Sequence, residues 1–136
     1  MVSDQSWFDT KYYMQNLKPI IHQHVNPLLA DFKTLHAGKA PETYSGFIYM
    51  WKCIPEDCYY IGSHQGTYYD EYRGSGRRFR QVFEHYGMTQ FERIILEYEK
   101  EKSDILSREQ YWINQFKAVK SAQFYNQKNA VKYLAN

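Results

Sequence analysis

The sequence has little of several features that would place a protein in a special class. It contains only two cysteines, and no second Cys or His pair stands at the spacing of zinc ligands. It has no apolar run long enough to span a membrane and no recognisable signal peptide. We therefore expect a cytoplasmic, intracellular protein with no membrane partner, in which Cys53 and Cys58 are free thiols.

The sequence also lacks a strong excess of charge of one sign. Its formal net charge is +2, so the overall charge does not indicate a nucleic-acid-binding protein. Two stretches differ from this average: residues 73–80 contain four arginines and no acid, and residues 117–136 contain four lysines and no acid. Such stretches can contact phosphates, although each one taken alone is equally consistent with a solvated surface.

Aromatic residues, in contrast, are abundant. They make up 18% of the chain, and 14 of them are tyrosines, which pack and form hydrogen bonds at once and so suit polar interfaces. The hydrophobic fraction of 43% is enough for a core. The length of 136 residues suits one domain, or one small domain with an extension.

The most informative stretch is a predicted hairpin. Two β-favouring runs, residues 47–53 and 58–61, flank residues 55–57, whose Pro-Glu-Asp sequence is typical of a turn. Each run carries a tyrosine, Tyr49 and Tyr60, at a position that a hairpin could bring onto one face. A glycine ends the second run and allows a backbone or a phosphate to come close.

This hairpin resembles the signature of the GIY-YIG nucleases. The pair Ile48-Tyr49 matches the end of its first half and Tyr60-Ile61-Gly62 matches its second half, although Phe47 stands where glycine is usual. Further matches follow in the family's order: Arg77 and Arg78 on a predicted helix, residues 108–113 as the glutamate helix, and Phe124-Tyr125-Asn126 as the closing tyrosine-asparagine. The resemblance covers residues 46–126.

The segments after the hairpin predict the remaining elements. A helix is expected over residues 77–86, with Gly87 ending it, and a strand over residues 90–98. A second helix is expected to follow a cap at Ser103 and to run to residue 116. The order β-β-α-β-α predicts an α+β fold with a three-stranded antiparallel sheet flanked by helices.

Glu109 occupies an unexpected place in the second helix. On a helical wheel it falls in the middle of the apolar face formed by Ile105, Trp112, Ile113 and Phe116. Because burying an unpaired carboxylate is unfavourable, a cation should meet it. The residues alone leave a divalent metal and an arginine as equal alternatives, and the family resemblance favours the metal.

The resemblance also implies an arginine near the start of the first helix that faces the hairpin. Arg78 flanks the apolar stripe of that helix, whereas Arg77 points nearly opposite, so Arg78 is favoured and Arg77 remains a candidate. Positive charge at a helix start opposes the helix dipole, which disfavours two purely structural arginines there.

The resemblance implies a metal-dependent endonuclease that cuts double-stranded DNA, similar to homing and restriction enzymes. Glu109 would hold one Mg²⁺ or Mn²⁺ ion, since one carboxylate cannot assemble a two-metal site, and an arginine would bind the phosphate. Tyr49, helped by Tyr60 or Lys52, would align or deprotonate the attacking water. The remaining candidates are His64, as a second proton acceptor, and Asn126, as an orienting hydrogen-bond partner. The alternative is a non-catalytic DNA-binding or assembly module on the same fold.

Residues 1–45 lie outside the resemblance, and we expect them to form an N-terminal helical extension to a nuclease domain at residues 46–136. One helix is predicted to reach Asn16, and another to run from Pro19 to Leu35 with a kink at Pro27. The second helix would carry an apolar stripe between residues 20 and 32. That stripe must be covered, either by packing on the nuclease domain or by pairing with a second copy of the chain. We expect the second, a homo-oligomer assembled through the N-terminal helices.

Overall fold

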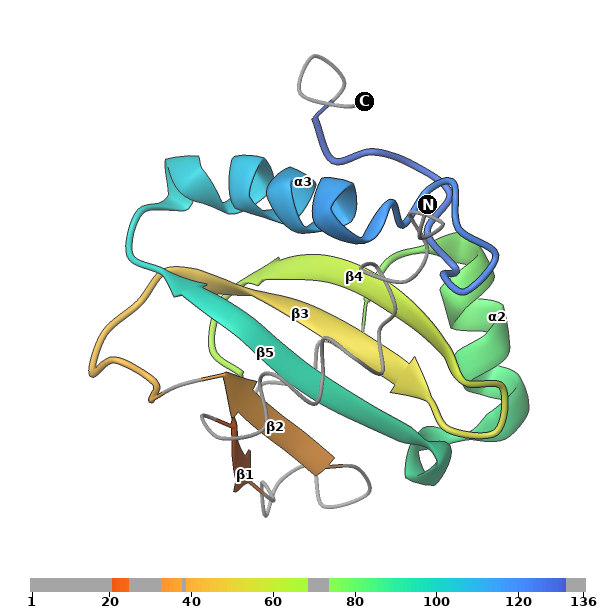
Figure 1. The fold of residues 1–136 in the computed structure, drawn as a ribbon. Coiled ribbons are helices and arrows are strands. Elements are labelled where there is room, and N and C mark those ends of the chain that lie inside the picture. Colours follow the sequence, from red (N-terminus) through yellow and green to blue (C-terminus); the bar gives the residue numbers. More distant parts are fainter. Residues whose placement is uncertain (1–20, 25–32, 38, 69–73, 132–136) are drawn as a thin grey trace, which may run out of the picture.

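The computed structural model describes residues 21–24, 33–37, 39–68 and 74–131 (Figure 1). The strands are β1 (Ile21–His24), β2 (Lys33–Ala37), β3 (Gly46–Cys53), β4 (Cys58–Gln65) and β5 (Phe91–Glu99). The helices are α2 (Arg77–Tyr86) and α3 (Ile105–Phe116). A short 3₁₀ turn, η4 (Met88–Gln90), lies between α2 and β5, and another, η5 (Lys102–Asp104), leads into α3. The predicted α2 is confirmed at both ends, and the predicted hairpin and the predicted β5 are confirmed to within four residues at their ends.

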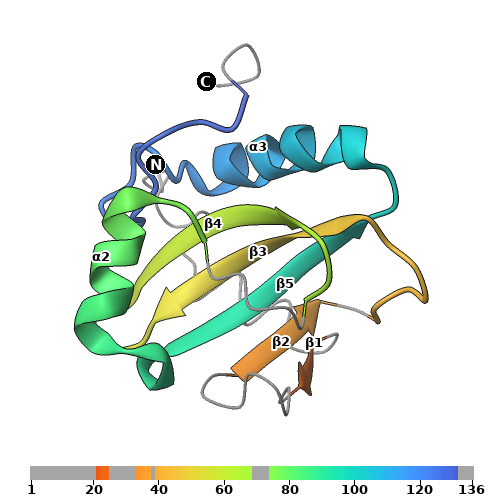
Figure 2. The ribbon, with the colours of Figure 1, turned by 180° about the vertical axis from the view of Figure 1, so that it is seen from behind.

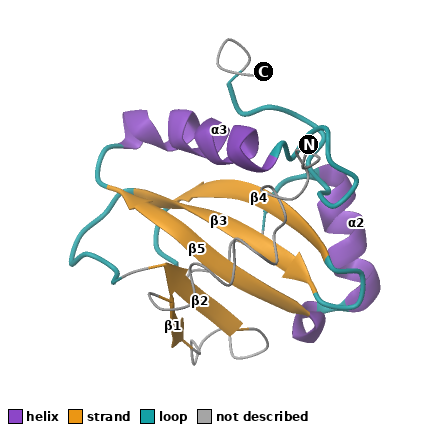
Figure 3. Cartoon of the chain, in the orientation of Figure 1, coloured by secondary structure: helices purple, strands orange, loops and turns teal. Residues whose placement is uncertain are grey.

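The strands form one mixed sheet in the order β1-β2-β5-β3-β4. β3 is the central strand of the expected antiparallel unit, because it pairs antiparallel with both β4 and β5. The expectation of a three-stranded antiparallel sheet is nevertheless wrong for the whole sheet. β2 adds to the free edge of β5 in parallel, and β1 pairs antiparallel with β2, on the side of the sheet away from β4 (Figure 3).

The predicted helix from Pro19 to Leu35 is also wrong where the structure describes it, since residues 21–24 and 33–37 are strands. A helical wheel considers only the spacing of side chains along one segment. It leaves out the open edge of β5, whose unpaired backbone groups form hydrogen bonds when β2 adds to it. Thr34 and His36, which lie on the same face of β2, are both buried and at most 6% exposed. The predicted first helix and most of the apolar stripe proposed for oligomerisation lie outside the described residues.

The two helices cover opposite faces of the sheet (Figures 1 and 2). On one face α3 packs against the side chains of β3 and β4 that include Ile48, Met50 and Ile61. On the other face α2 inserts Phe79 among the aromatic side chains of β3 and β5, including Trp51 and Phe91. β3 is therefore buried on both faces, and β4 is the edge strand beside which both helices pass.

The ends of the helices match the sequence prediction only in part. Gly87, which has a positive φ of 84°, ends α2 as predicted. α3 begins at Ile105, and Ser103 is not its cap, because Ser103 belongs to the preceding 3₁₀ turn and the N-cap position is taken by Asp104. Cys53 and Cys58 lie opposite each other at the end of the hairpin as free thiols.

Gly62 is required by the packing of Tyr49 across the hairpin. The two residues are direct cross-strand partners, and a Cβ atom at position 62 would overlap the Tyr49 phenol, lying 2.6 Å from its Cζ. The second glycine of the hairpin motif is thus explained by a ring that lies over its backbone.

We expect Gly62→Ala to lower the free energy of unfolding by about 1–3 kcal/mol, because the added methyl group overpacks the core beside the Tyr49 ring. Urea unfolding followed by fluorescence measures the change. The double variant Tyr49→Leu with Gly62→Ala removes the ring that would be overlapped, so its loss should be smaller than the sum of the two single losses. An additive double variant would contradict this explanation.

Candidate active site

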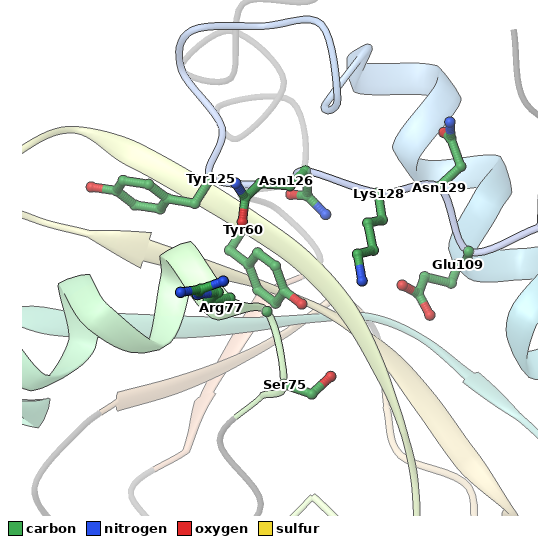
Figure 4. A pocket seen from close by; sticks show the side chains of 11 residues that line it. Tyr60, Ser75, Arg77, Glu109, Tyr125, Asn126, Lys128 and Asn129 are labelled. Carbon is green, nitrogen blue, oxygen red and sulfur yellow. The ribbon is translucent and has the colours of Figure 1, made fainter.

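A cavity of about 280 Å³ lies at the outer edge of β4, where α2, α3 and the segment after α3 meet (Figure 4). Tyr60, on the face of β4 that packs against α2, and Glu109, from α3, both line it. Its remaining lining residues are Ser75, Gly76, Arg77 and the continuous segment 125–130. The cavity therefore straddles the sheet edge, and side chains from both layers of the molecule reach it.

Glu109 points into this cavity from α3 (Figure 4). The Ser63 hydroxyl, on the neighbouring part of β4, donates a 2.5 Å hydrogen bond to Oε1 of Glu109. Burial raises the pKa of the Glu109 carboxyl, and the Ser63 hydrogen bond opposes this rise only in part. Arg108, the adjacent arginine on the same helix, binds Glu97 instead of Glu109, with two hydrogen bonds of 2.7 and 2.8 Å. The arrangement is that of a carboxylate suited to receive an added cation.

The two tyrosines of the hairpin lie on the same face of the sheet, as the sequence predicted, but in different surroundings. Their ring centroids are 6.4 Å apart. Tyr60 stacks on Phe79 of α2, with 4.5 Å between centroids and 8° between planes, and it lines the cavity. Tyr49 is 1% exposed, and its hydroxyl lies beside the backbone of Gly62 and Gly74.

Gly76 makes the position of the Tyr60 hydroxyl possible. A Cβ atom at position 76 would lie 2.7 Å from that hydroxyl and 2.6 Å from the ring, so only glycine leaves room for it. The same glycine is the N-cap of α2 and provides no side-chain cap, and the first turn of α2 contains no acid. The positive end of the helix therefore opens at the cavity, with Gly76 and Arg77 in its wall.

The two candidate arginines occupy different places. Arg77 lines the cavity that contains Glu109 and Tyr60. The guanidinium of Arg78 lies 5.5 Å from the centroid of the Tyr125 ring, and with Arg77 it lines a second, shallower hollow beside the first. Arg77, the first residue of α2, lines both hollows, and its guanidinium lies on the α2 side of the cavity, away from Glu109 (Figure 4).

Asn126 holds the edge of β4 beside Tyr60. Its Oδ1 accepts a 2.9 Å hydrogen bond from the Ile61 N–H, and its Nδ2 donates a 2.8 Å hydrogen bond to the Ile61 carbonyl. Just before it, the N–H of Tyr125 donates to the carbonyl of Tyr59, so the segment runs beside β4 like a short parallel strand. Asn126 thus fixes the backbone of Ile61, the residue between Tyr60 and Gly62.

The other two sequence candidates are not part of the cavity wall. His64 lies on the same face as Tyr60, further along β4. Its ring forms a T-shaped contact with the Phe47 ring, with 5.8 Å between the two centroids. Lys52 lies at the far end of the hairpin, where its Nζ is 4.0 Å from Asp57. The structure brings Tyr60, Arg77, Glu109 and Asn126 together and places Tyr49 just behind them.

α3 is held in place by a set of contacts that sequence reasoning missed. Glu97 of β5 accepts hydrogen bonds from Arg108 and from the Trp112 indole, the latter at 2.7 Å. These two residues flank Glu109 in the sequence, so Glu97 fixes the helix that presents the carboxylate. The spacing of Glu97, Arg108 and Trp112 in the sequence does not predict this contact. Only the packing of α3 against β5 reveals it.

Beside this contact, Glu99 is 8% exposed, and burial together with its neighbour Glu97 raises its pKa to about 8. At a pH between these two values, the folded protein therefore keeps a proton on Glu99 that the unfolded chain, with a pKa near 4.5, has lost. Stability should fall as pH rises from about 5 to 8, by at most about 1.4 kcal/mol per pH unit from this group.

We expect Glu99→Gln to remove this part of the pH dependence and to melt at a higher temperature than the wild type at pH 8, because glutamine loses no proton. Thermal denaturation of both proteins between pH 5 and pH 8 measures the effect. Glu101→Gln, at an exposed position, is the matched control. Parallel curves for Glu99→Gln and the wild type would contradict the assignment.

Comparison with known proteins identifies the family of the part of the chain that contains most of this cavity. A family model described as the GIY-YIG catalytic domain matches residues 45–126, which is more than half of the chain. No curated protein and no solved structure matches the sequence. None of the described helices is long and apolar enough to cross a bilayer. The family match covers the hairpin, both helices and the asparagine that meet at the cavity, so the chain belongs to the GIY-YIG family of nuclease domains.

Proposed function

We propose that this protein is a metal-dependent DNA endonuclease that hydrolyses phosphodiester bonds with one divalent ion, Mg²⁺ or Mn²⁺. The convergence of Glu109, Arg77 and Tyr60 on one cavity carries the proposal. These are a carboxylate, a guanidinium and a hydroxyl, the groups that metal binding, phosphate binding and water alignment require. Residues 46–136 would form the catalytic domain and residues 1–45 an extension that adds strands to its sheet.

The surroundings of Glu109 fit a hard divalent ion. Mg²⁺ is commonly held by one or two carboxylates while water and phosphate oxygens fill its other positions. Ser63 engages one oxygen of Glu109, and the carboxylate faces the cavity. Among the described residues no group of three or more His, Cys, Asp or Glu side chains could hold a metal, so the site would rely on water and substrate. When bound, the ion would act as a Lewis acid toward the leaving oxygen.

The side chains of this protein would do the rest. Arg77 would bind two oxygens of the scissile phosphate and offset the charge that develops on it. Tyr60, stacked on Phe79 and wedged against Gly76, would align the attacking water with its hydroxyl. Tyr49 would support this arrangement from behind, and Asn126 would keep Tyr60 in place through Ile61.

The direct test is incubation of the purified protein with supercoiled plasmid DNA in Mg²⁺, in Mn²⁺ and in EDTA. We expect nicked and linear products with either metal, no products in EDTA, and recovery when excess Mg²⁺ is added. A gel-shift assay on the same DNA separates the alternative function. A protein that binds DNA but cuts it under none of these conditions would be a non-catalytic DNA-binding module and would overturn the proposal.

A further inference from the structure

The segment that follows Asn126 forms one wall of the cavity, although it lies beyond the residues that the family model matches. It is fixed to α3 by Gln110, the residue next to Glu109, whose side chain is fully buried. The Gln110 amide donates a 2.9 Å hydrogen bond to Oδ1 of Asn129 and accepts a 2.9 Å hydrogen bond from the N–H of Val131.

Lys128 lies between the two anchored points of this segment. On one side Asn126 is bound to Ile61 of β4, and on the other side Asn129 is bound to Gln110 of α3. Because the chain is held two residues before Lys128 and again at the residue after it, the backbone of Lys128 has little freedom to move. Its side chain is exposed and points into the cavity toward Glu109, where an incoming substrate can reach it (Figure 4).

We propose that Lys128 binds the scissile phosphate and stabilises its charge during cleavage, acting from the α3 side while Arg77 acts from α2. This inference rests on the proposed endonuclease function and adds a second protein cation to it. An ammonium group acts as a point charge and needs no bidentate geometry, so it can contact a phosphate oxygen that Arg77 leaves open.

A purely structural role, as the ion-pair partner of Glu109, fits the geometry less well. Among the described residues Lys128 has no carboxylate oxygen within 4.0 Å of its ammonium group. The lysine side chain is flexible, and its ammonium group can move onto a phosphate without breaking an ion pair. Phosphate hydrolysis gathers negative charge in the transition state, and a positioned cation there acts where the charge develops.

The test compares Lys128→Ala, Lys128→Arg and Lys100→Ala in single-turnover cleavage of a duplex oligonucleotide at saturating Mg²⁺. Lys100 is an exposed lysine outside the cavity and serves as the matched control. We expect Lys128→Ala to lower the rate about 10- to 100-fold, Lys128→Arg to recover most of it, and Lys100→Ala to stay within about twofold. The salt dependence of duplex binding in EDTA should lose about one unit of slope in Lys128→Ala only.

Anchoring is tested with Asn129→Ala, which removes the hydrogen bond to Gln110 and leaves Lys128 itself intact. We expect a loss of about 3- to 10-fold, and little further loss when Asn129→Ala is added to Lys128→Ala, because both act through the same ammonium group.

Three results would overturn the inference. A wild-type protein that does not cleave DNA removes the proposed function and this inference together. A cleaving wild type with an unaffected Lys128→Ala variant removes only the inference. A Lys128→Ala variant that keeps the maximal rate but needs less Mg²⁺ shows that Lys128 merely neutralises Glu109.

Discussion

Replacing Glu109 with glutamine is expected to abolish DNA cleavage while the protein stays folded. Glutamine has nearly the same shape and can still accept the hydrogen bond from Ser63, so the packing of α3 should survive. It cannot supply the negative charge that a divalent ion needs. Since a metal acting as a Lewis acid contributes several kcal/mol to such a reaction, the rate should fall by at least about a thousandfold.

Thermal stability gives this variant a second readout. Burial raises the pKa of Glu109, so ionising it at neutral pH weakens the fold in the absence of metal, and that destabilisation should end where glutamine replaces the acid. We expect Glu109→Gln to melt no lower than the wild type in EDTA at pH 7. Glu84→Gln, at an exposed position of α2, is the matched control for both measurements. A Glu109→Gln variant that nicks plasmid at the wild-type rate would remove Glu109 from the mechanism.

Replacing Arg77 with alanine is expected to slow cleavage by about two to three orders of magnitude, the usual loss when one positioned donor to a transition-state charge is removed. Arg77 is the arginine that shares the cavity with Glu109 and Tyr60. Single-turnover rates at saturating DNA measure the effect, because they exclude losses that come only from weaker binding.

Arg78→Ala is the matched comparison, since the two arginines are adjacent and equally charged. Arg78 lies over the Tyr125 ring and lines the neighbouring hollow, where it would meet a flanking phosphate. We expect its loss to raise the DNA concentration needed for half-maximal rate and to change the single-turnover rate less than tenfold. A larger rate loss in Arg78→Ala than in Arg77→Ala would reverse the assignment and support the choice that the helical wheel favours.

The choice between these arginines shows where sequence reasoning stops. A helical wheel reports which side of a helix a residue faces, and on that measure Arg78 flanks the buried stripe that Phe79 anchors. The cavity lies at the start of α2, where Gly76 and Arg77 line it, and Arg78, one residue further along the helix, does not. The location of a cavity relative to a helix end is a property of the packed layers and has no periodicity in the sequence.

The N-terminal region shows the same limit in the fold. The apolar spacing around residues 20–32 favours a helix, yet residues 21–24 and 33–37 are strands. Local spacing records which side chains avoid water, whereas the strand is imposed by the free backbone edge of β5, more than fifty residues away in the chain.

The sequence by itself determined the parts of this protein that depend on local chemistry. It predicted the hairpin with its turn at residues 55–57, both helices that flank the sheet, and a carboxylate at Glu109 whose pKa burial raises. These features follow from turn propensity, from helical spacing and from the desolvation of a charge, each of which is readable within a few residues.

Only the tertiary structure decided which of the candidate groups meet. The cavity gathers Tyr60 from β4, Arg77 from the end of α2, Glu109 from α3 and Lys128 from the segment that Gln110 anchors. It also places Tyr49 behind the site and Lys52 at the far end of the hairpin. These positions depend on how two layers and one sheet edge pack together, because contacts between residues distant in the chain are set by the shapes and burial of whole elements.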